Sequence, residues 1–542
     1  MLNKRLWPIW PSVAGTISCN TPEEGGAVAT DTSMLVNLGL GLLPVLWLLV
    51  AMVATPLPAY VSSLGALALS LVLARAWWGL GAPEATGAIL EGTAFALWNV
   101  CLVIVAALFA YDLLAHTGSL DVIGTLLSSI TRDRRVVELL IIWGFGNLLE
   151  GMAGFGTAVA IPTSILVGLG FEPLPIVVAS LVANAMPTAF GSVGVPTQTL
   201  ASVSGMDAIA LSGSIAAMEL VVMLAMPLVI VTICEGGMRA LSGMLPTSLV
   251  ASVSFAVPWL AVAQVAGPEL PNVIGAACSV CCTVAFMRLR PNNEPDQRFV
   301  LSGQEGATIA PVGETLRACA PFVLMFVLLM VTSSFVPPVH DALAAISSKV
   351  VLYPGEDAGS LEFRWLCAPG TIILVAALAG GLIQGLGARE MLGLLAGTLR
   401  KNLKTIVTIC SIVAAAKVMG YSGMTLDVAL ALVAMTGGAY PLISPVIGAL
   451  GGFATGSGTS ANVLFGQLQV QAAEAIGASP LWMAASNAMG AGIGKALSTQ
   501  CVAIGTGATG LSGNESQVFR RVLVPAVACL VVASALCLWL AT

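Results

Sequence analysis

Charged side chains are the scarcest feature of this sequence. Only 9% of its 542 residues are Asp, Glu, Lys or Arg, whereas an ordinary soluble domain has about 25%. A chain with so little charge cannot cover a surface that faces water, so lipid is expected to be its main solvent. The formal net charge of −6 and the small number of histidines, His116 and His340, also argue against a basic surface for nucleic acid.

The sequence also lacks the motifs of several enzyme and pump classes. The two histidines lie too far apart for a zinc-binding HExxH motif, and no GxSxG nucleophile motif occurs. A Walker A phosphate-binding motif is missing, and a GxGxxG string at 505–510 has no strand–helix–strand context. ATP-driven pumping is therefore disfavoured, and an intramembrane enzyme is only a distant alternative.

Cysteine is present but gives little sign of chemistry. The twelve cysteines lie mostly inside apolar runs, and the one cluster is Cys278, Cys281 and Cys282. This cluster has no accompanying histidine or fourth cysteine in a polar loop, so buried apolar thiols are a better interpretation than a metal site. We expect neither a metal nor a cofactor.

Long apolar runs are what the sequence has in abundance, since 57% of its residues are hydrophobic. A spanning helix needs about 20 mostly apolar residues. Runs that qualify lie at 35–54, 57–80, 93–115, 214–233, 319–337, 370–388 and 521–541. Together with the glycine-rich segments described below, they predict an all-α polytopic membrane protein with about 12 to 14 membrane-embedded elements.

The predicted domain organisation is simple. Residues 1–33 lack the apolar core of a signal peptide and are expected to form a short tail. Residues 34–542 are expected to form one transmembrane domain in the cell membrane. The polar loop 289–316 is too short to bury a core of its own.

An internal repeat is the most informative pattern. The sequence GFGT at 154–157 corresponds to GSGT at 456–459, and Asn-Ala-Met at 184–186 corresponds to the same tripeptide at 487–489. Thr-Gln at 197–198 then corresponds to Thr-Gln at 499–500, at nearly the same offset. The sequence thus predicts two repeat cassettes, at 148–201 and 450–508.

Each cassette opens with a glycine cluster that disfavours a regular helix, because glycine costs about 1 kcal/mol in a helix interior. Broken backbone at membrane depth is tolerated only where protein or a water-filled cavity satisfies it, and paired breaks mark the central site of many transporters. We therefore predict re-entrant hairpins or broken helices at 148–170 and 450–470. Discontinuous helices are predicted at 174–201 and 479–508, with interruptions near Asn184–Pro187 and Asn487–Gly490.

Polar side chains at these breaks are candidate substrate ligands. Half-helix N-termini carry a positive partial charge that suits a carboxylate. Hydroxyl and amide groups can bind carboxylate or hydroxyl oxygens without a standing charge. The candidates are Thr157, Asn184, Thr459, Ser460, Asn462 and Asn487. The alternative for any one of them is close packing of helices through small residues.

Two ionisable residues stand in the glycine-rich parts of the cassettes, Glu150 in the first and Lys495 in the second. An isolated charge at the bilayer centre costs about 3 kcal/mol, so it normally has a partner or a function. Lys495 could attract an anionic substrate, while Glu150 could accept and release a coupling proton. The alternative is that the two residues pair with each other, or with neighbouring groups, as structural charges.

These motifs together resemble the lactate permease family of proton-coupled 2-hydroxy-acid symporters. The resemblance rests on LLEGMAGFGT at 148–157, on the AN-x-x-P-x-AFG break at 183–191, and on GSGTSANVLFGQLQ at 456–469. GK at 494–495, followed by Ser498 and Gln500, continues it. The resemblance implies uptake of lactate or glycolate with a proton, on a fold of two inverted repeats. It also adds Gln500 to the expected substrate ligands.

One departure from the family pattern concerns the second hairpin. Family members have an acidic residue or its amide where this chain has Gly458, and a polar residue where it has Ala461. The substrate and the coupling ion are therefore both left open by the sequence. The alternative to a proton symporter of L-lactate, D-lactate or glycolate is a sodium-coupled transporter, or a transporter of another organic anion, from the same superfamily.

Overall fold

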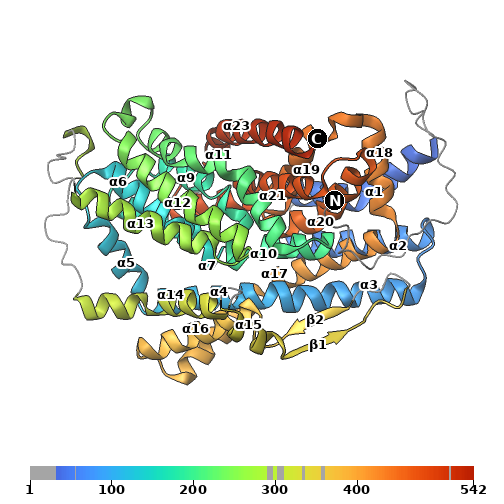
Figure 1. Ribbon diagram of the computed structural model, residues 1–542, viewed down its shortest axis with the longest axis horizontal. Coiled ribbons are helices and arrows are strands. Elements are labelled where there is room, and N and C mark those ends of the chain that lie inside the picture. Colours follow the sequence, from blue (N-terminus) through green and yellow to red (C-terminus); the bar gives the residue numbers. More distant parts are fainter. Residues whose placement is uncertain are drawn as a thin grey trace, which may run out of the picture.

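The computed structural model describes residues 32–54, 57–154, 156–289, 297–301, 311–332, 336–355, 360–511 and 514–542. These residues are almost entirely helical, apart from one antiparallel β-hairpin that pairs Ser347–Val350 with Leu361–Arg364. Figure 1 shows helices packed along the long axis of the molecule. The tail predicted at 1–33 lies mostly outside the described residues.

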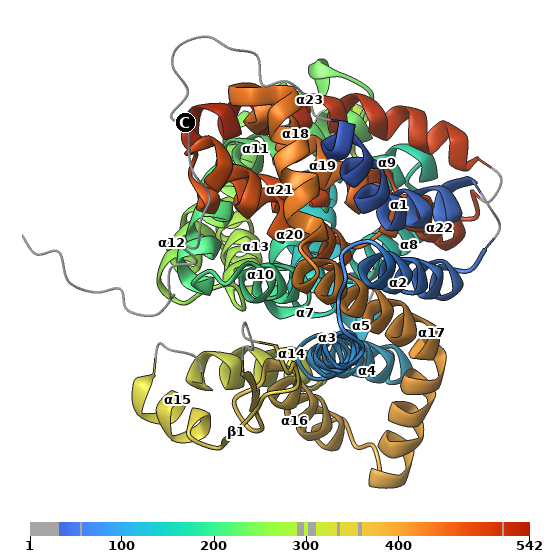
Figure 2. The same cartoon turned by 90° about the vertical axis from the view of Figure 1, so that its right-hand side faces the viewer.

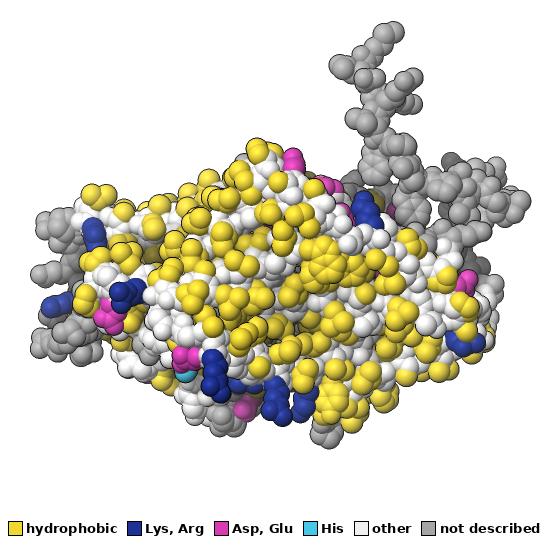
Figure 3. Space-filling model, turned by 90° about the horizontal axis from the view of Figure 1, so that it is seen from below, with side chains coloured by type: hydrophobic (Ala, Val, Ile, Leu, Met, Phe, Trp, Pro, Cys, Tyr) yellow, Lys and Arg dark blue, Asp and Glu magenta, His cyan; other side chains and the backbone are white. Residues whose placement is uncertain are grey.

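The described helices have the length and composition of a membrane protein. Nine are long and apolar enough to span a bilayer, and one bent pair and three shorter apolar helices accompany them. Hydrophobic side chains cover most of the face drawn in Figure 3, with few charged groups among them. The protein is thus an all-α, polytopic integral membrane protein, as the apolar runs predict.

The helices form two layers, which Figure 2 separates clearly. The lower layer contains α3 (Ala82–Phe95), η1 (Ala96–Cys101), α4 (Leu102–His116), α14 (Val312–Thr332), α15 (Pro337–Ala344), β1 (Ser347–Val350), β2 (Leu361–Arg364) and α16 (Pro369–Ile383). Between the layers run α5 (Ser119–Ser128) and α17 (Ala388–Tyr421).

The upper layer holds both repeat cassettes. It contains α1 (Thr32–Ala54), α2 (Ala59–Ala76), α6 (Arg134–Glu138), η2 (Leu139–Phe145), α7 (Gly146–Met152), α8 (Thr157–Gly168), α9 (Pro173–Ala183), η3 (Pro187–Phe190), α10 (Gly191–Ser204), α11 (Ala208–Cys234), α12 (Leu245–Val265), α13 (Pro271–Leu289), α18 (Met424–Thr436), α19 (Tyr440–Thr455), α20 (Gly458–Ile476), α21 (Pro480–Leu497), α22 (Thr499–Ala508) and α23 (Glu515–Ala541). Short 3-10 turns lie at η4 (Met238–Leu241), η5 (Gln297–Phe299) and η6 (Gly437–Ala439).

An ion pair and a hydrogen bond connect α17 to α3 and α4. The Nζ atom of Lys417 lies 2.7 Å from Oε1 of Glu91, and the hydroxyl of Thr398 donates to Asp112. Charged groups in lipid-embedded helices need such partners, because an unpaired charge is costly there. These contacts make α17 a firm link between the lower layer and the rest of the molecule.

The first cassette is broken where the glycine pattern predicts. The helix that ends with α7 stops at Met152, and α8 begins at Thr157 after two glycines, Gly154 and Gly156, with positive φ. The next helix ends at Ala183, and the segment 187–204 continues it at an angle of 63°. The interruption predicted near Asn184–Pro187 is therefore confirmed.

The second cassette differs from the prediction in one break. A turn at Gly456, with φ of 65°, separates α19 from α20 as expected. However, α21 runs unbroken through 487–490, so the interruption predicted there is wrong. The helix is interrupted at Ser498, whose backbone is extended, before α22 begins.

The glycines of α19 and α21 pack the two helices together instead of breaking them. A methyl group added at Gly448 or Gly452 would lie 2.3 or 2.0 Å from a carbonyl oxygen of α21. One added at Gly490 or Gly494 would lie 2.0 or 1.9 Å from a carbonyl oxygen of α19. Small residues at four-residue spacing let membrane helices approach this closely, which explains why glycine is tolerated here in an intact helix.

Candidate functional site

A buried ion pair joins the two cassettes. The Nζ atom of Lys495, on α21, lies 2.8 Å from Oε1 of Glu150, on α7, and donates a 3.1 Å hydrogen bond to the hydroxyl of Thr188. The two charged side chains are only 7% and 2% exposed. The second carboxylate oxygen of Glu150 is buried and has no hydrogen-bond partner among the described residues. Lys495 is thus the counter-charge that holds this carboxylate in the protein interior.

A tight and strained turn packs against the pair. A methyl group added at Gly191 would lie 2.5 Å from Oε1 of Glu150. The next two residues, Ser192 and Val193, have left-handed backbone angles with φ of 45° and 56°. The Ser192 hydroxyl donates a 2.8 Å hydrogen bond to the carbonyl of Ala153, which connects this turn to the break between α7 and α8. Non-glycine residues in this conformation cost about 1–3 kcal/mol each and cluster at functional sites.

A small cavity reaches Lys495 from one side, and we call it the lysine pocket. Its volume is about 180 Å³, and its lining includes Lys404 on α17, Lys495 and Gly156. The described lining contains two lysines and no Asp or Glu. Lys404 also lies over the ring of Tyr60, with Nζ 5.8 Å from the ring centroid. The pocket therefore has the charge and size for a small organic anion.

Three helix N-termini add to this positive potential. The helix α8 begins beside Gly156, α20 begins after Ser457, and α22 begins after Ser498. The Ser457 hydroxyl accepts a hydrogen bond from the amide of Ser460, and both serines line the lysine pocket. The N-terminus of a helix carries about half a positive charge and offers free N–H groups to an anion. The breaks in the two cassettes thus bring the starts of three helices to the lysine pocket, where Gly156, Ser457 and Gln500 line it.

Three of the eight predicted ligands line the lysine pocket, whereas Thr157, Thr459 and the three asparagines do not. Lys495, Ser460 and Gln500 line the lysine pocket. Thr157 and Thr459 stand one residue beyond Gly156 and Gly458, in the first turns of α8 and α20, and both are buried. The Thr157 hydroxyl donates 2.7 Å to the carbonyl of Gly154, so it holds the turn in this conformation.

The three predicted asparagines do not line the pocket. Asn487 donates to the side chain of Asn462 at 3.0 Å, and Asn462 donates to the carbonyl of Pro196 at 3.1 Å. Asn184 accepts the Thr188 hydroxyl through its backbone carbonyl at 2.7 Å, while its side-chain nitrogen is buried and without a partner in the described structure. The side-chain amides of Asn462 and Asn487 thus link α10, α20 and α21.

Sequence reasoning missed two residues at this site, for different reasons. Lys404 stands in the polar stretch RKNLK, which looks like the solvated part of a helix, so nothing local marks it as a pocket residue. Thr188 lies in the predicted break and contacts Lys495, and its place beside a proline-induced turn is a signal that could have been used.

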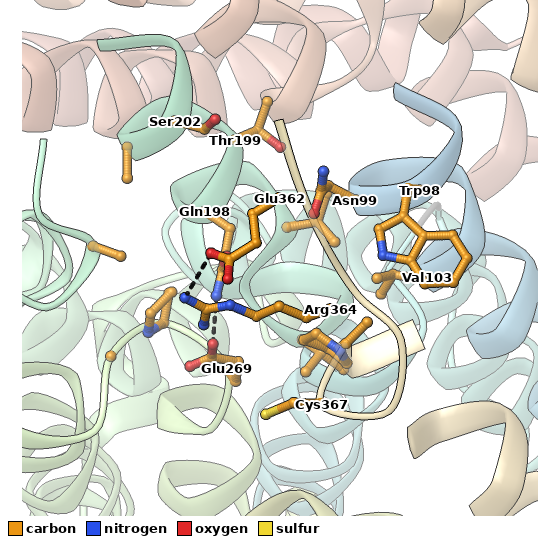
Figure 4. Close-up of a pocket in the computed structure, with 18 of the residues that line it drawn as sticks. Trp98, Asn99, Val103, Gln198, Thr199, Ser202, Glu269, Glu362, Arg364 and Cys367 are labelled. Carbon is orange, nitrogen blue, oxygen red and sulfur yellow. Dashed lines mark hydrogen bonds and ion pairs between the residues drawn. The ribbon is translucent and has the colours of Figure 1, made fainter. Parts of the chain in front are cut away.

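A second and larger cavity lies between the lower layer and α10, and Figure 4 shows it. Its volume is about 570 Å³, and the β-hairpin forms part of its wall. The elements of the Glu150–Lys495 pair do not line it, although Val193 of the strained turn does. The molecule therefore has one cavity that reaches the pair and another that reaches the turn beside it.

Comparison with known proteins identifies related chains. A family model described as L-lactate permease matches residues 37–542. An L-lactate permease from Streptococcus iniae is 41% identical over 452 residues, which cover 82% of this chain and 93% of the relative. The glycolate permease GlcA of Escherichia coli is 34% identical, with 88% of this chain and 91% of the relative covered. The solved structure of Neisseria gonorrhoeae MtrF, described as illuminating a class of antimetabolite efflux pumps, is 13% identical and covers 93% of this chain and 95% of its own, with a TM-score of 0.46.

Proposed function

Because this chain belongs to the L-lactate permease family, we propose that it is a proton-coupled transporter of L-lactate or a related small 2-hydroxymonocarboxylate. It is an integral membrane transport protein rather than an enzyme. The names of its relatives, an L-lactate permease and a glycolate permease, support this class of substrate. The observation that carries the proposal is the buried Glu150–Lys495 pair beside a cationic pocket.

In the proposed cycle, Lys495 binds the carboxylate of the substrate. The lysine pocket attracts an anion through Lys404 and the three helix N-termini. At the inner end of the pocket, the substrate carboxylate displaces Glu150 from the ammonium of Lys495. In this proposal the 2-hydroxyl group binds to the hydroxyl of Ser460 and the amide of Gln500, two residues that line the same pocket. Specificity for a hydroxy acid follows, because an analogue without the hydroxyl leaves these groups unpaired.

Exchange of partners on Lys495 couples the substrate to a proton. A buried carboxylate that loses its counter-charge is costly, by several kcal/mol, and protonation removes that charge. Glu150 therefore takes up one proton when the substrate binds. It releases this proton when the substrate leaves and the ion pair between Glu150 and Lys495 forms again. One monoanion and one proton move together, and the cycle carries no net charge across the membrane.

Uptake into proteoliposomes tests the proposed function. Purified protein is reconstituted, and uptake of labelled L-lactate is followed with an inward proton gradient and, separately, with an inward sodium gradient. We expect saturable uptake that depends on the proton gradient and is abolished by a protonophore. Uptake that depends only on sodium would contradict the proposal that the coupling ion is a proton. Absence of uptake of L-lactate, glycolate and D-lactate under both gradients would contradict the proposed substrate class.

A further inference from the structure

The larger cavity is built on three sides by different parts of the chain. Gln198, Thr199 and Ser202 of α10 form one wall, and Trp98 and Asn99 of η1 form another. The β-hairpin supplies Glu362 and Arg364, whose side chains extend between these walls in Figure 4. The segment η1 is a π-helical turn, a feature found frequently at functional sites. We call this space the hairpin cavity.

Its hydrogen-bond donors are incompletely used. The guanidinium of Arg364 donates to Glu362 at 3.3 Å, and their side chains are 49% and 32% exposed. A pair this exposed contributes about 0–1 kcal/mol, so another carboxylate can replace Glu362 on the arginine. The indole N–H of Trp98 is buried and has no partner in the described chain. Together these groups offer a bidentate cation and a neutral donor within one cavity.

Three acidic residues line the hairpin cavity beside Arg364, namely Asp207, Glu269 and Glu362. Glu269, in the loop between α12 and α13, accepts a short hydrogen bond from Gln198. Burial raises the pKa of the Glu269 carboxyl, although Gln198, His340 and Arg364 act in the opposite direction. This carboxyl therefore holds its proton to a higher pH than an exposed glutamate does. The remaining acids of the lining, Glu362 and Asp207, belong to the hairpin and to the start of α11.

The helix α10 lies between the hairpin cavity and α20, whose first turn lines the lysine pocket. Val195, Thr199 and Ser202 of α10 line the hairpin cavity, whereas the carbonyl of Pro196 and the side chain of Leu200 face α20. The strained turn before α10 presents Val193 to the hairpin cavity and Gly191 to Glu150. A few residues of backbone thus separate the hairpin cavity from the ion pair.

We propose that the hairpin cavity is a second binding site for the transported hydroxycarboxylate, on the opposite side of α10 from the lysine pocket, with Arg364 as its carboxylate ligand. Trp98 and Asn99 donate to the remaining oxygens of the substrate. The site collects the substrate before a path opens past α10 toward Lys495, so it governs flux that starts from its own side. This inference rests on the proposed function, because the ligand is the substrate named there.

Fluxes measured in the two directions test this site. Initial rates of L-lactate transport are measured in intact cells and in inside-out membrane vesicles for wild type, Arg364→Gln and Lys349→Gln. Lys349 lies directly opposite Glu362 in the β1–β2 register. It does not line the cavity, so it is a matched control for loss of one charge. We expect Arg364→Gln to raise the KM about tenfold in one direction only, as for loss of one charge-assisted hydrogen bond. Lys349→Gln should leave both KM values unchanged.

The outcomes separate this site from the function on which it rests. An unchanged KM in both directions for Arg364→Gln, with normal wild-type transport, would overturn the second site and leave the proposed function intact. An equal increase of the KM in both directions would also overturn the second site, because Arg364 would then affect a step that transport in both directions shares. Absence of saturable lactate transport in the wild type would overturn the proposed function itself. Arg364→Lys, which keeps the charge but not the bidentate geometry, should fall between wild type and Arg364→Gln.

Discussion

At the residue scale, the central feature is a buried ion pair between a lysine and a glutamate. Lys495 and Glu150 come from opposite repeat cassettes, and each is almost fully buried. A buried ion pair adds little net stability, but removing one partner leaves the other charge uncompensated. The pair is therefore suited to a site where a substrate anion and a proton replace the two partners in turn.

Loss of Lys495 should destabilise the protein unless Glu150 is neutralised as well. We expect Lys495→Gln to lower the free energy of unfolding by about 3–5 kcal/mol and the double variant Lys495→Gln/Glu150→Gln to recover most of it. Thermal unfolding in detergent measures this. Lys401→Gln is the control, because its Nζ lies 3.8 Å from Asp112 and its side chain is 73% exposed. Equal melting temperatures for Lys495→Gln and Lys401→Gln would contradict the buried-pair interpretation.

A single methyl group at Gly191 should disturb the pair without breaking the backbone. Gly191 has φ of −67° and ψ of 157°, which alanine adopts freely, but the new Cβ would lie 2.5 Å from Oε1 of Glu150. We therefore expect Gly191→Ala to reduce lactate uptake at least about tenfold while the protein stays folded. Gly168→Ala, where no atom lies within 4 Å, is the control and should transport normally. Wild-type uptake in Gly191→Ala would show that the carboxylate position is not critical.

The sequence allowed some of these residues to be predicted but not others. Lys495 and Glu150 are recognisable because charge inside an apolar segment is costly. Lys404 is not, because its place in the pocket depends on how α17 packs, which no local pattern records. The predicted asparagines show the reverse: Asn462 and Asn487 are polar and buried, but they bond to each other. Residue type indicates that a polar group needs a partner, and only packing determines which partner it has.

At the element scale, glycine has two different consequences in this fold. At Gly154, Gly156 and Gly456 the backbone takes positive φ and a helix ends. In α19 and α21 the same residue type keeps a helix intact and brings two helices into contact. The sequence predicted the break between α7 and α8 and the break after Ala183, but the interruption expected within 479–508 was placed too early in the chain. The four-residue spacing of Gly490 and Gly494 was the signal for packing rather than for a break.

The packing role of these glycines has a direct test. In Gly494→Ala the new methyl group would lie 1.9 Å from the carbonyl oxygen of Ala449, so the helices must separate. We expect a loss of about 1–3 kcal/mol in stability, as for overpacking of a core. Gly393→Ala, in the interior of α17 with no neighbour within 4 Å, should instead be neutral or stabilising by up to about 1 kcal/mol. Melting temperatures that fall equally in both variants would contradict the packing role.

At the scale of the whole molecule, the two cavities lie where different groups of elements meet. The lysine pocket lies between α17 and the helix breaks of the two cassettes. The hairpin cavity lies between the lower layer and α10. Apolar runs were enough to predict a polytopic helical protein, because lipid imposes the same length on every span. The layers and the cavities could not be predicted, since they depend on contacts between segments far apart in the chain.

Transport of one monoanion with one proton should be insensitive to the membrane potential. We expect the initial rate of lactate uptake under a fixed proton gradient to stay the same when a potassium diffusion potential of either sign is imposed with valinomycin. One additional cation per cycle would couple the potential to transport by about 2.3 kcal/mol per 100 mV. A clear acceleration at negative internal potential would therefore contradict the one-to-one stoichiometry.

The most direct test of the account is to separate exchange from accumulation in Glu150→Gln. The variant keeps the shape of the side chain and removes its charge, so Lys495 remains free to bind the substrate carboxylate. In proteoliposomes we expect Glu150→Gln to exchange external labelled L-lactate for internal unlabelled lactate at a rate within about tenfold of wild type. It should fail to accumulate lactate when an inward proton gradient is imposed. Proton-driven accumulation that persists in Glu150→Gln would contradict the assignment of Glu150 as the proton site and the exchange of partners on Lys495.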